Sequence, residues 1–242
     1  EKELTQILQR GLTDEIFLKE LRQRALKQSK KFSWDKTAEK AFLAIESFVP
    51  TTSEAKAASP FSRAQRKKLA VFTPYPPDKS GIADYSLELL ESLSQWYEID
   101  VFAEHPTLTT QTLDGDYNLK PVSDFVPNSK CYDRILYQFG NSPYHSYMFD
   151  LLDQFPGVVT LHDFFLSGVI ANFELQGQKP FAWREALYYS HGYAALLDHK
   201  TLSDAEVVWK YPCSLGVLQK SLGTIIHSKF AAELIRDWYG SP

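Results

Sequence analysis

The sequence has 242 residues, a formal net charge of −4 at pH 7, and 44% hydrophobic and 23% charged residues, which is typical of a globular protein with one large or two small domains. The negative charge disfavours a nucleic-acid-binding protein. Two cysteines are too few for a disulfide framework, no stretch approaches the roughly 18 apolar residues of a membrane span, and the first residues lack a secretion-signal pattern. We therefore expect a soluble protein of the cytoplasm.

Residues 1–49 are predicted to be helical. Thr13 is expected to cap one helix, followed by acidic residues in its first turn. The apolar face of that helix would contain Phe17, Leu21 and Ala25. Ser33 is expected to cap a second helix with a longer apolar stripe, which must be buried against another element. This stripe comprises Trp34, Ala38, Ala41, Phe42, Ile45 and Phe48.

Residues 50–65 contain small and polar residues with two prolines and are predicted to be a linker. The basic run Arg63–Lys68 closes it. We interpret this run as a solvated lead-in to the first strand, with contact to an anionic membrane surface as the alternative.

Residues 66–242 alternate between short apolar runs and helical patterns. This alternation predicts a doubly wound α/β domain with a parallel sheet covered on both faces. The expected strands are 69–73, 98–103, 133–140, 157–163 and 223–228, with a further short strand near 120–125. The last helix is expected to be capped by Ser228 and to pack Phe230, Leu234 and Trp238.

Ligands of such sheets bind beyond the carboxyl ends of the strands. The turn after the first strand carries Gly81, which would let an anion approach the free N–H groups of a helix; an ordinary turn glycine is the alternative. A dehydrogenase-type dinucleotide site is disfavoured because the G-x-G-x-x-G pattern is absent. His162, at another strand end, is a candidate to contact a ligand hydroxyl or carry a proton, or else a histidine bonded within the fold.

Several other sites find no support in the sequence. His145 and His227 are interpreted as structural, and the histidines show no metal-ligand spacing with cysteines or carboxylates. No G-x-S-x-G elbow of a serine hydrolase is present. The many aromatic residues suit either core packing or a site for sugar rings.

Four blocks in order resemble the N-terminal, acceptor-side domain of family 4 glycosyltransferases of the GT-B fold. These blocks are "FTPYPPDKSGIADYSLELLESL", "YQFGNSPYHSYMFDLL", "GVVTLHDFFLSG" and "IIHSKFAAELIRDWYG", and the resemblance covers about residues 68–242. Residues 1–49 are similar to the last helices of the C-terminal domain of the same family. The resemblance therefore implies a piece of a tandem protein, in which one module ends before the linker and the next begins at residue 66.

The resemblance implies transfer of a sugar from a nucleotide-sugar donor to a saccharide or glycolipid acceptor, with retention at the anomeric carbon and without a metal or other cofactor. It places the turn Ser80-Gly81-Ile82 near the donor diphosphate and His162 near the donor sugar. Asn141, Tyr144 and Asp163 follow by position as acceptor or sugar contacts. We expect a cytoplasmic protein, with the inner face of the membrane as an alternative location through peripheral contact.

The sequence departs from the family at two points. The donor domain of the family carries two glutamates eight positions apart, and here only Glu46 and Glu54 have this spacing, running from a helix into the linker. The turn has Ser80-Gly81 where many relatives have two glycines. We therefore expect a chain that lacks the donor-binding domain and is inactive alone. The alternatives are a non-catalytic module that binds glycan or protein, and a nucleotide-sugar epimerase of the same fold.

Overall fold

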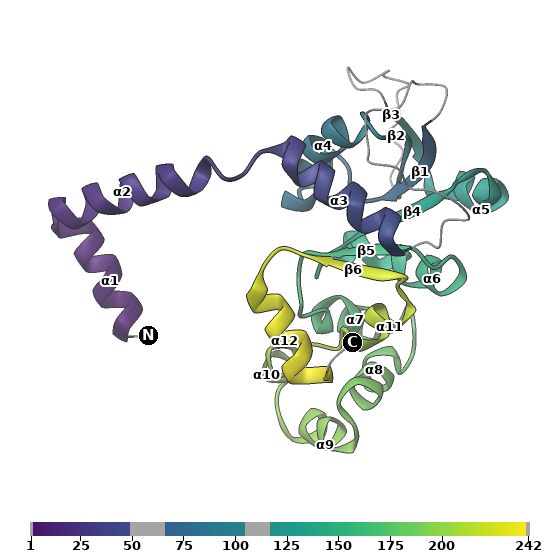
Figure 1. Cartoon of the computed structure of the whole chain (residues 1–242). Helices are drawn as coiled ribbons and strands as arrows, with labels where there is room; N and C mark the ends of the chain where they lie inside the picture. Colours follow the sequence, from purple (N-terminus) through teal and green to yellow (C-terminus); the bar gives the residue numbers. More distant parts are fainter. Residues whose placement is uncertain (1, 49–65, 105–116, 241–242) are drawn as a thin grey trace.

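The computed structural model describes residues 2–48, 66–104 and 117–240. Within them lies a sheet of six parallel strands in the order β3-β2-β1-β4-β5-β6, which confirms the predicted α/β, Rossmann-like class (Figure 1). The strands are β1 (Lys67–Phe72), β2 (Tyr97–Ala103), β3 (Tyr117–Pro121), β4 (Arg134–Phe139), β5 (Val158–Leu161) and β6 (Gly223–Ile226). The strand expected near 120–125 thus comes earlier, because a short 3₁₀ helix, Val122–Asp124, follows it directly.

Alternate side chains of the inner strands pack into two separate hydrophobic cores, one on each face of the sheet. Leu69 and Val71 of β1 pack on one face of the sheet, and Ala70 and Phe72 pack on the other, as the two-residue period of a strand requires. The first face is covered by α3 (Trp34–Phe48) and α4 (Gly81–Leu93). Among the described residues, seven helices supply buried side chains to the core on the second face: α5 (Phe125–Asn128), α6 (Ser146–Gln154), α7 (Ser167–Leu175), α8 (Ala182–His191), α9 (Tyr193–Thr201), α10 (Asp204–Lys210) and α11 (Leu215–Lys220).

The middle of the α3 stripe is buried against the α/β domain, as expected, whereas Trp34 and Phe48 at its two ends are 36% and 38% exposed. Ala38, Ala41, Phe42 and Ile45 are the buried residues of this helix. The ring of Phe42 stacks on Trp96 with centroids 4.7 Å apart, and Trp34 lies edge-on to Tyr85 at 5.2 Å. Helix α3 is therefore a structural part of the sheet's first face.

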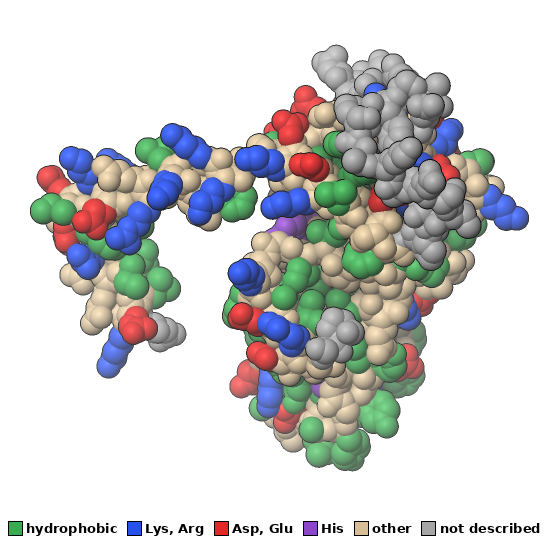
Figure 2. Space-filling model, in the orientation of Figure 1, with side chains coloured by type: hydrophobic (Ala, Val, Ile, Leu, Met, Phe, Trp, Pro, Cys, Tyr) green, Lys and Arg blue, Asp and Glu red, His purple; other side chains and the backbone are tan. Residues whose placement is uncertain are grey.

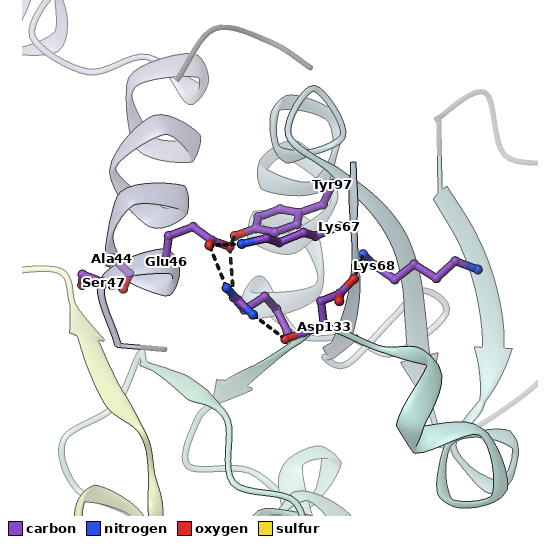
Figure 3. A network of polar contacts seen from close by, with 8 residues as sticks. Ala44, Glu46, Ser47, Lys67, Lys68, Tyr97 and Asp133 are labelled. Atoms are coloured by element: carbon purple, nitrogen blue, oxygen red, sulfur yellow. Dashed lines mark hydrogen bonds and ion pairs between the residues drawn. The ribbon is translucent and has the colours of Figure 1, made fainter. Parts of the chain in front are cut away.

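A polar network fixes the end of α3 to the amino ends of three strands (Figure 3). Glu46 accepts hydrogen bonds from Arg134 of β4 at 3.0 and 2.8 Å, from Lys67 of β1 at 2.5 Å and from Tyr97 of β2 at 2.8 Å. Burial alone would raise the pKa of Glu46, but these bonds outweigh it and hold the pKa below its usual range. Glu46 thus has a structural partner set at the end of the sheet opposite the ligand side, and Glu54 lies outside the described residues.

Helices α1 (Lys2–Thr13) and α2 (Glu15–Ser29) stand away from the sheet and contain no buried residue (Figure 1). Their hydrophobic side chains lie open on the surface (Figure 2). The apolar face predicted for Phe17, Leu21 and Ala25 is therefore not buried within the described chain. The expected cap at Thr13 is wrong: Thr13 ends α1, and the carboxylate of Asp14 caps α2 by accepting the N–H of Phe17 at 2.9 Å.

Helix α12 (Lys229–Tyr239) follows β6 and is capped by Ser228, as predicted. Leu234 packs against the second core, and Trp238 contacts the ring of His191 at 5.0 Å. The packing expected for Phe230 is wrong: it is 66% exposed, because it lies in the first turn of α12, before the helix reaches the core. None of the described helices is long and apolar enough to cross a lipid bilayer.

Candidate functional site

The strand order reverses between β1 and β4, and such a reversal opens a crevice at the carboxyl ends of the strands. The turns after β1, β4 and β5 all come to this edge. They carry the predicted residues Ser80-Gly81-Ile82, Asn141 and His162-Asp163. The site is therefore built from three separate turns on one rigid sheet.

Gly140, directly after β4, is the residue around which these turns pack most closely. A Cβ atom there would lie 2.3 Å from the Ile82 side chain, 2.8 Å from His145 Nε2 and 3.2 Å from Asp163 Oδ2. The Asp163 carboxylate also accepts the N–H of Asn141 at 2.8 Å. Only a residue without a side chain allows the start of α4 to approach β4 and β5 so closely.

Asn141 is held by the fold rather than left free for a ligand. Its side-chain oxygen accepts the N–H of Val169 in α7 at 2.8 Å, and its own N–H goes to Asp163. Asp163 itself is exposed, so its carboxylate is open to a ligand. Tyr144 is half-buried, and the contacts among the described residues do not connect it with this group.

His162 lies at the centre of a second chain of contacts. Its Nε2 is 2.7 Å from Gln138 Oε1, and its Nδ1 is 3.2 Å from His227 Nε2. The ring of Tyr85, from α4, lies edge-on to both imidazoles, with centroids 4.8 and 5.3 Å away. His227 follows β6 and is exposed, so the chain runs from the buried Gln138 to the surface.

The contacts define the protonation of His162. Burial, with smaller contributions from His227 and His145, lowers the pKa of His162 to about 3, so the ring is neutral at pH 7. Because Gln138 Oε1 is an acceptor only, His162 Nε2 carries the proton and Nδ1 accepts from His227. A neutral imidazole of this kind orients hydrogen-bonding groups and is a poor proton donor near pH 7.

N–H groups in the first turn of α4 already donate hydrogen bonds to Ser80. The Ser80 hydroxyl accepts the N–H of Ile82 at 3.3 Å, and the Ser80 carbonyl accepts the N–H of Ala83 at 3.0 Å. Asp84 adds a negative charge to the first turn. A bound diphosphate would therefore have to displace the Ser80 hydroxyl, although the space beside Gly81 is open, with no atom within 4 Å of its Cβ position.

Gln138, His145 and His227 belong to the site, but the sequence did not predict them as functional residues. Gln138 is buried in β4 and contacts His162, and His145 is fully buried with Nδ1 2.9 Å from the Gln138 carbonyl. His145 Nε2 and Gln138 Nε2 have no hydrogen-bond partner among the described residues. The available signal was the polar Gln138 within the apolar run "RILYQF". Burial lowers the pKa of His145 to about 4.

No group of three or more His, Cys, Asp or Glu in the described part of the chain could hold a metal ion. Comparison of the sequence and fold with families of known proteins, with curated proteins and with solved structures finds no match. The chain is thus an α/β protein whose candidate site is a group of hydrogen-bonding side chains around His162. The site lies at the carboxyl ends of the strands, where the strand order reverses between β1 and β4 (the switch point of the sheet).

Proposed function

We propose that this chain is the acceptor-side half of a GT-B glycosyltransferase, which transfers a sugar from a nucleotide-sugar donor to a saccharide or glycolipid acceptor. The observation that carries the proposal is the meeting of His162, Asp163 and the start of α4 at the reversal between β1 and β4. This is the edge where doubly wound sheets bind their ligands. The four sequence blocks that resemble family 4 glycosyltransferases supply these same turns.

The side chains at this edge of the sheet carry hydrogen-bonding groups that suit the hydroxyl groups of a sugar. The exposed Asp163 carboxylate and the exposed His227 ring offer hydrogen bonds to hydroxyl groups, and the neutral His162 holds His227 in place. In this proposal His162 orients the sugar and is not a nucleophile. A partner domain supplies most of the donor contacts, and the open space beside Gly81 admits the diphosphate.

The N-terminal helices support the tandem arrangement in the proposal. Helices α1 and α2 expose apolar residues along their whole length and bury none, as expected of helices that complete a preceding module. Helix α3 instead packs on the sheet of the present domain, so it would connect the two modules.

The proposal is tested on the full-length natural protein. It is incubated with UDP-glucose, GDP-mannose or ADP-glucose, each with and without a mixture of oligosaccharides, and the release of nucleoside diphosphate and the sugar products are measured. A transferase releases the diphosphate and elongates an oligosaccharide. An isomerised sugar formed without acceptor would identify an epimerase instead, and the absence of any product would leave no support for an enzyme.

One observation favours a second candidate, a non-catalytic module that binds glycan or protein. Both ring nitrogens of His162 contact protein groups, which is also the pattern of a structural histidine. This candidate expects the full-length protein to bind an oligosaccharide unchanged. Oligosaccharide binding measured by titration calorimetry, together with no product in the assay above, would support it.

A further inference from the structure

A cavity of about 600 Å³ lies between α6, α7, α8 and α11, on the second face of the sheet. Its inner wall contains the buried side chains of Leu152, Ile170, Phe173 and Val217. The volume is in the range of sites for small molecules in proteins, which are mostly apolar with a few polar groups. None of the residues assigned to the sugar site lines this cavity.

Two buried, uncharged polar groups also line the cavity. The Ser190 hydroxyl is buried and has no hydrogen-bond partner among the described residues, and such a buried hydroxyl costs free energy until something bonds to it. Cys213 is buried, and burial raises the pKa of its thiol to about 12, so it is neutral. The interior thus offers a hydrogen bond and no charge.

The rim of the cavity is charged, but its cations are already paired. Lys179 lies 2.5 Å from Asp150, and Lys220 pairs with Asp153. Glu185 adds a third carboxylate to the rim, which leaves an excess of negative charge. An anionic ligand would meet this excess, whereas an uncharged ligand would not.

We propose that this cavity binds an uncharged, mainly apolar small molecule with one hydrogen-bonding group for Ser190. The apolar wall binds the body of the ligand, and the carboxylates of the rim exclude anions. This site is independent of the proposed glycosyltransferase function, and it can be tested on the present chain.

The test uses two dyes with the same rings, N-phenyl-1-naphthylamine, which is neutral, and 8-anilino-1-naphthalenesulfonate, which is anionic. We expect the neutral dye to saturate one site per chain and the anionic dye to bind at least about tenfold more weakly. Equal binding of the two dyes, or no saturable binding of the neutral one, would overturn the proposal.

A matched pair of glycine variants locates the dye. A side chain at Gly216 would enter the cavity without a clash, since no atom lies within 4 Å of its Cβ position, and the same is true of Gly11 on α1. We expect Gly216→Leu to reduce the affinity at least about tenfold and Gly11→Leu to leave it unchanged. Affinity that survives Gly216→Leu would place the dye elsewhere, such as on the apolar faces of α1 and α2, and the proposal would be wrong.

A measurement on the unmodified chain guards against misfolding of the variant. The neutral dye should slow alkylation of Cys213, which lines the cavity, and leave the exposed Cys131 unaffected. The two cysteine peptides are compared by mass spectrometry after reaction with N-ethylmaleimide. Equal protection or no protection of the two thiols would contradict binding in this cavity.

Discussion

Glu46, near the end of α3, accepts two hydrogen bonds from the guanidinium of Arg134 at the start of β4, at 3.0 and 2.8 Å. The Arg134 side chain is only 9% exposed and that of Glu46 17%. This pair ties a helix that precedes the linker to the centre of a sheet that follows it. The α/β domain therefore depends on residues outside the segment that forms its strands.

Substitution of Glu46 should destabilise the fold, because it leaves the Arg134 charge without its partner. Loss of one partner of a fully buried ion pair costs about 3–5 kcal/mol, and since both groups retain some exposure we expect Glu46→Gln to cost about 2 kcal/mol. Urea denaturation measures the free energy of unfolding. Glu39→Gln, on the exposed face of the same helix, is the control, and equal effects of the two substitutions would show that the network does not stabilise the domain.

Removal of the first two helices should leave the domain intact. A chain of residues 33–242 loses no buried residue of α1 or α2, so its free energy of unfolding should change by less than about 0.5 kcal/mol. A chain of residues 49–242 also loses Phe42 and Ile45 from the core, which should cost at least about 4 kcal/mol. Thermal and urea unfolding compare the three chains, and a large loss with the shorter deletion would mean that α1 and α2 stabilise the domain.

The two glycines of the site should respond differently to alanine. In Gly140→Ala the new methyl group meets Ile82, His145 and Asp163, and overpacking of this kind costs about 1–3 kcal/mol. Gly81→Ala places its methyl group in open space at the start of α4, so the change should be neutral or should stabilise by up to about 1 kcal/mol. If both variants unfold at the same denaturant concentration, the close approach at Gly140 is not present in solution.

The buried His145 should make the protein less stable in mild acid. Burial lowers its pKa from 6.5 to about 4, so below pH 6.5 the unfolded chain takes up a proton that the folded chain does not. The free energy of unfolding should therefore fall between about pH 6.5 and 4, by up to about 1.4 kcal/mol per pH unit from this group.

His145→Asn isolates this contribution, because asparagine keeps a donor for the Gln138 carbonyl and does not titrate. The variant should be less stable than the wild type at pH 7.5 but should lose less stability by pH 5. His191 and His227, whose pKa values are also lowered by burial, act equally in both proteins. Loss of the smaller contribution of His145 to the lowered pKa of His162 acts in the same direction as loss of the His145 titration itself. Parallel stability curves for the wild type and the variant would contradict the assigned burial of His145.

The sheet could be predicted from the sequence because its strands are continuous apolar runs between turn signals, and the docking of α3 followed from a stripe of residues with no other place to be buried. The cap of α2 was misplaced by one residue because Thr13 and Asp14 are both good caps, and only the geometry shows that the carboxylate takes the position. Phe230 lies on the apolar face that the helical period of α12 predicts. The period alone does not show which turns of that helix reach the core.

The candidate site was predicted as a set of strand ends, but its connections were not. The contact between His162 and His227 joins residues that follow two different strands, and Gln138 reaches His162 from a third. These contacts depend on the order of strands in the sheet, which a sequence does not state. The helix start at Gly81 was expected to present free N–H groups, and the Ser80 hydroxyl, which caps this helix, already binds one of them.

The most direct test of the proposed function compares two histidines in the full-length protein. Sugar transfer is measured for His162→Ala and His191→Ala, with the donor that is active in the product assay. His191 is the control, because its pKa is also lowered by burial and its ring packs on Tyr211 and Trp238. We expect His162→Ala to reduce the turnover about 100-fold through loss of sugar orientation, while His191→Ala keeps most of it. Equal turnover of the two variants would contradict a functional site at the switch point of the sheet.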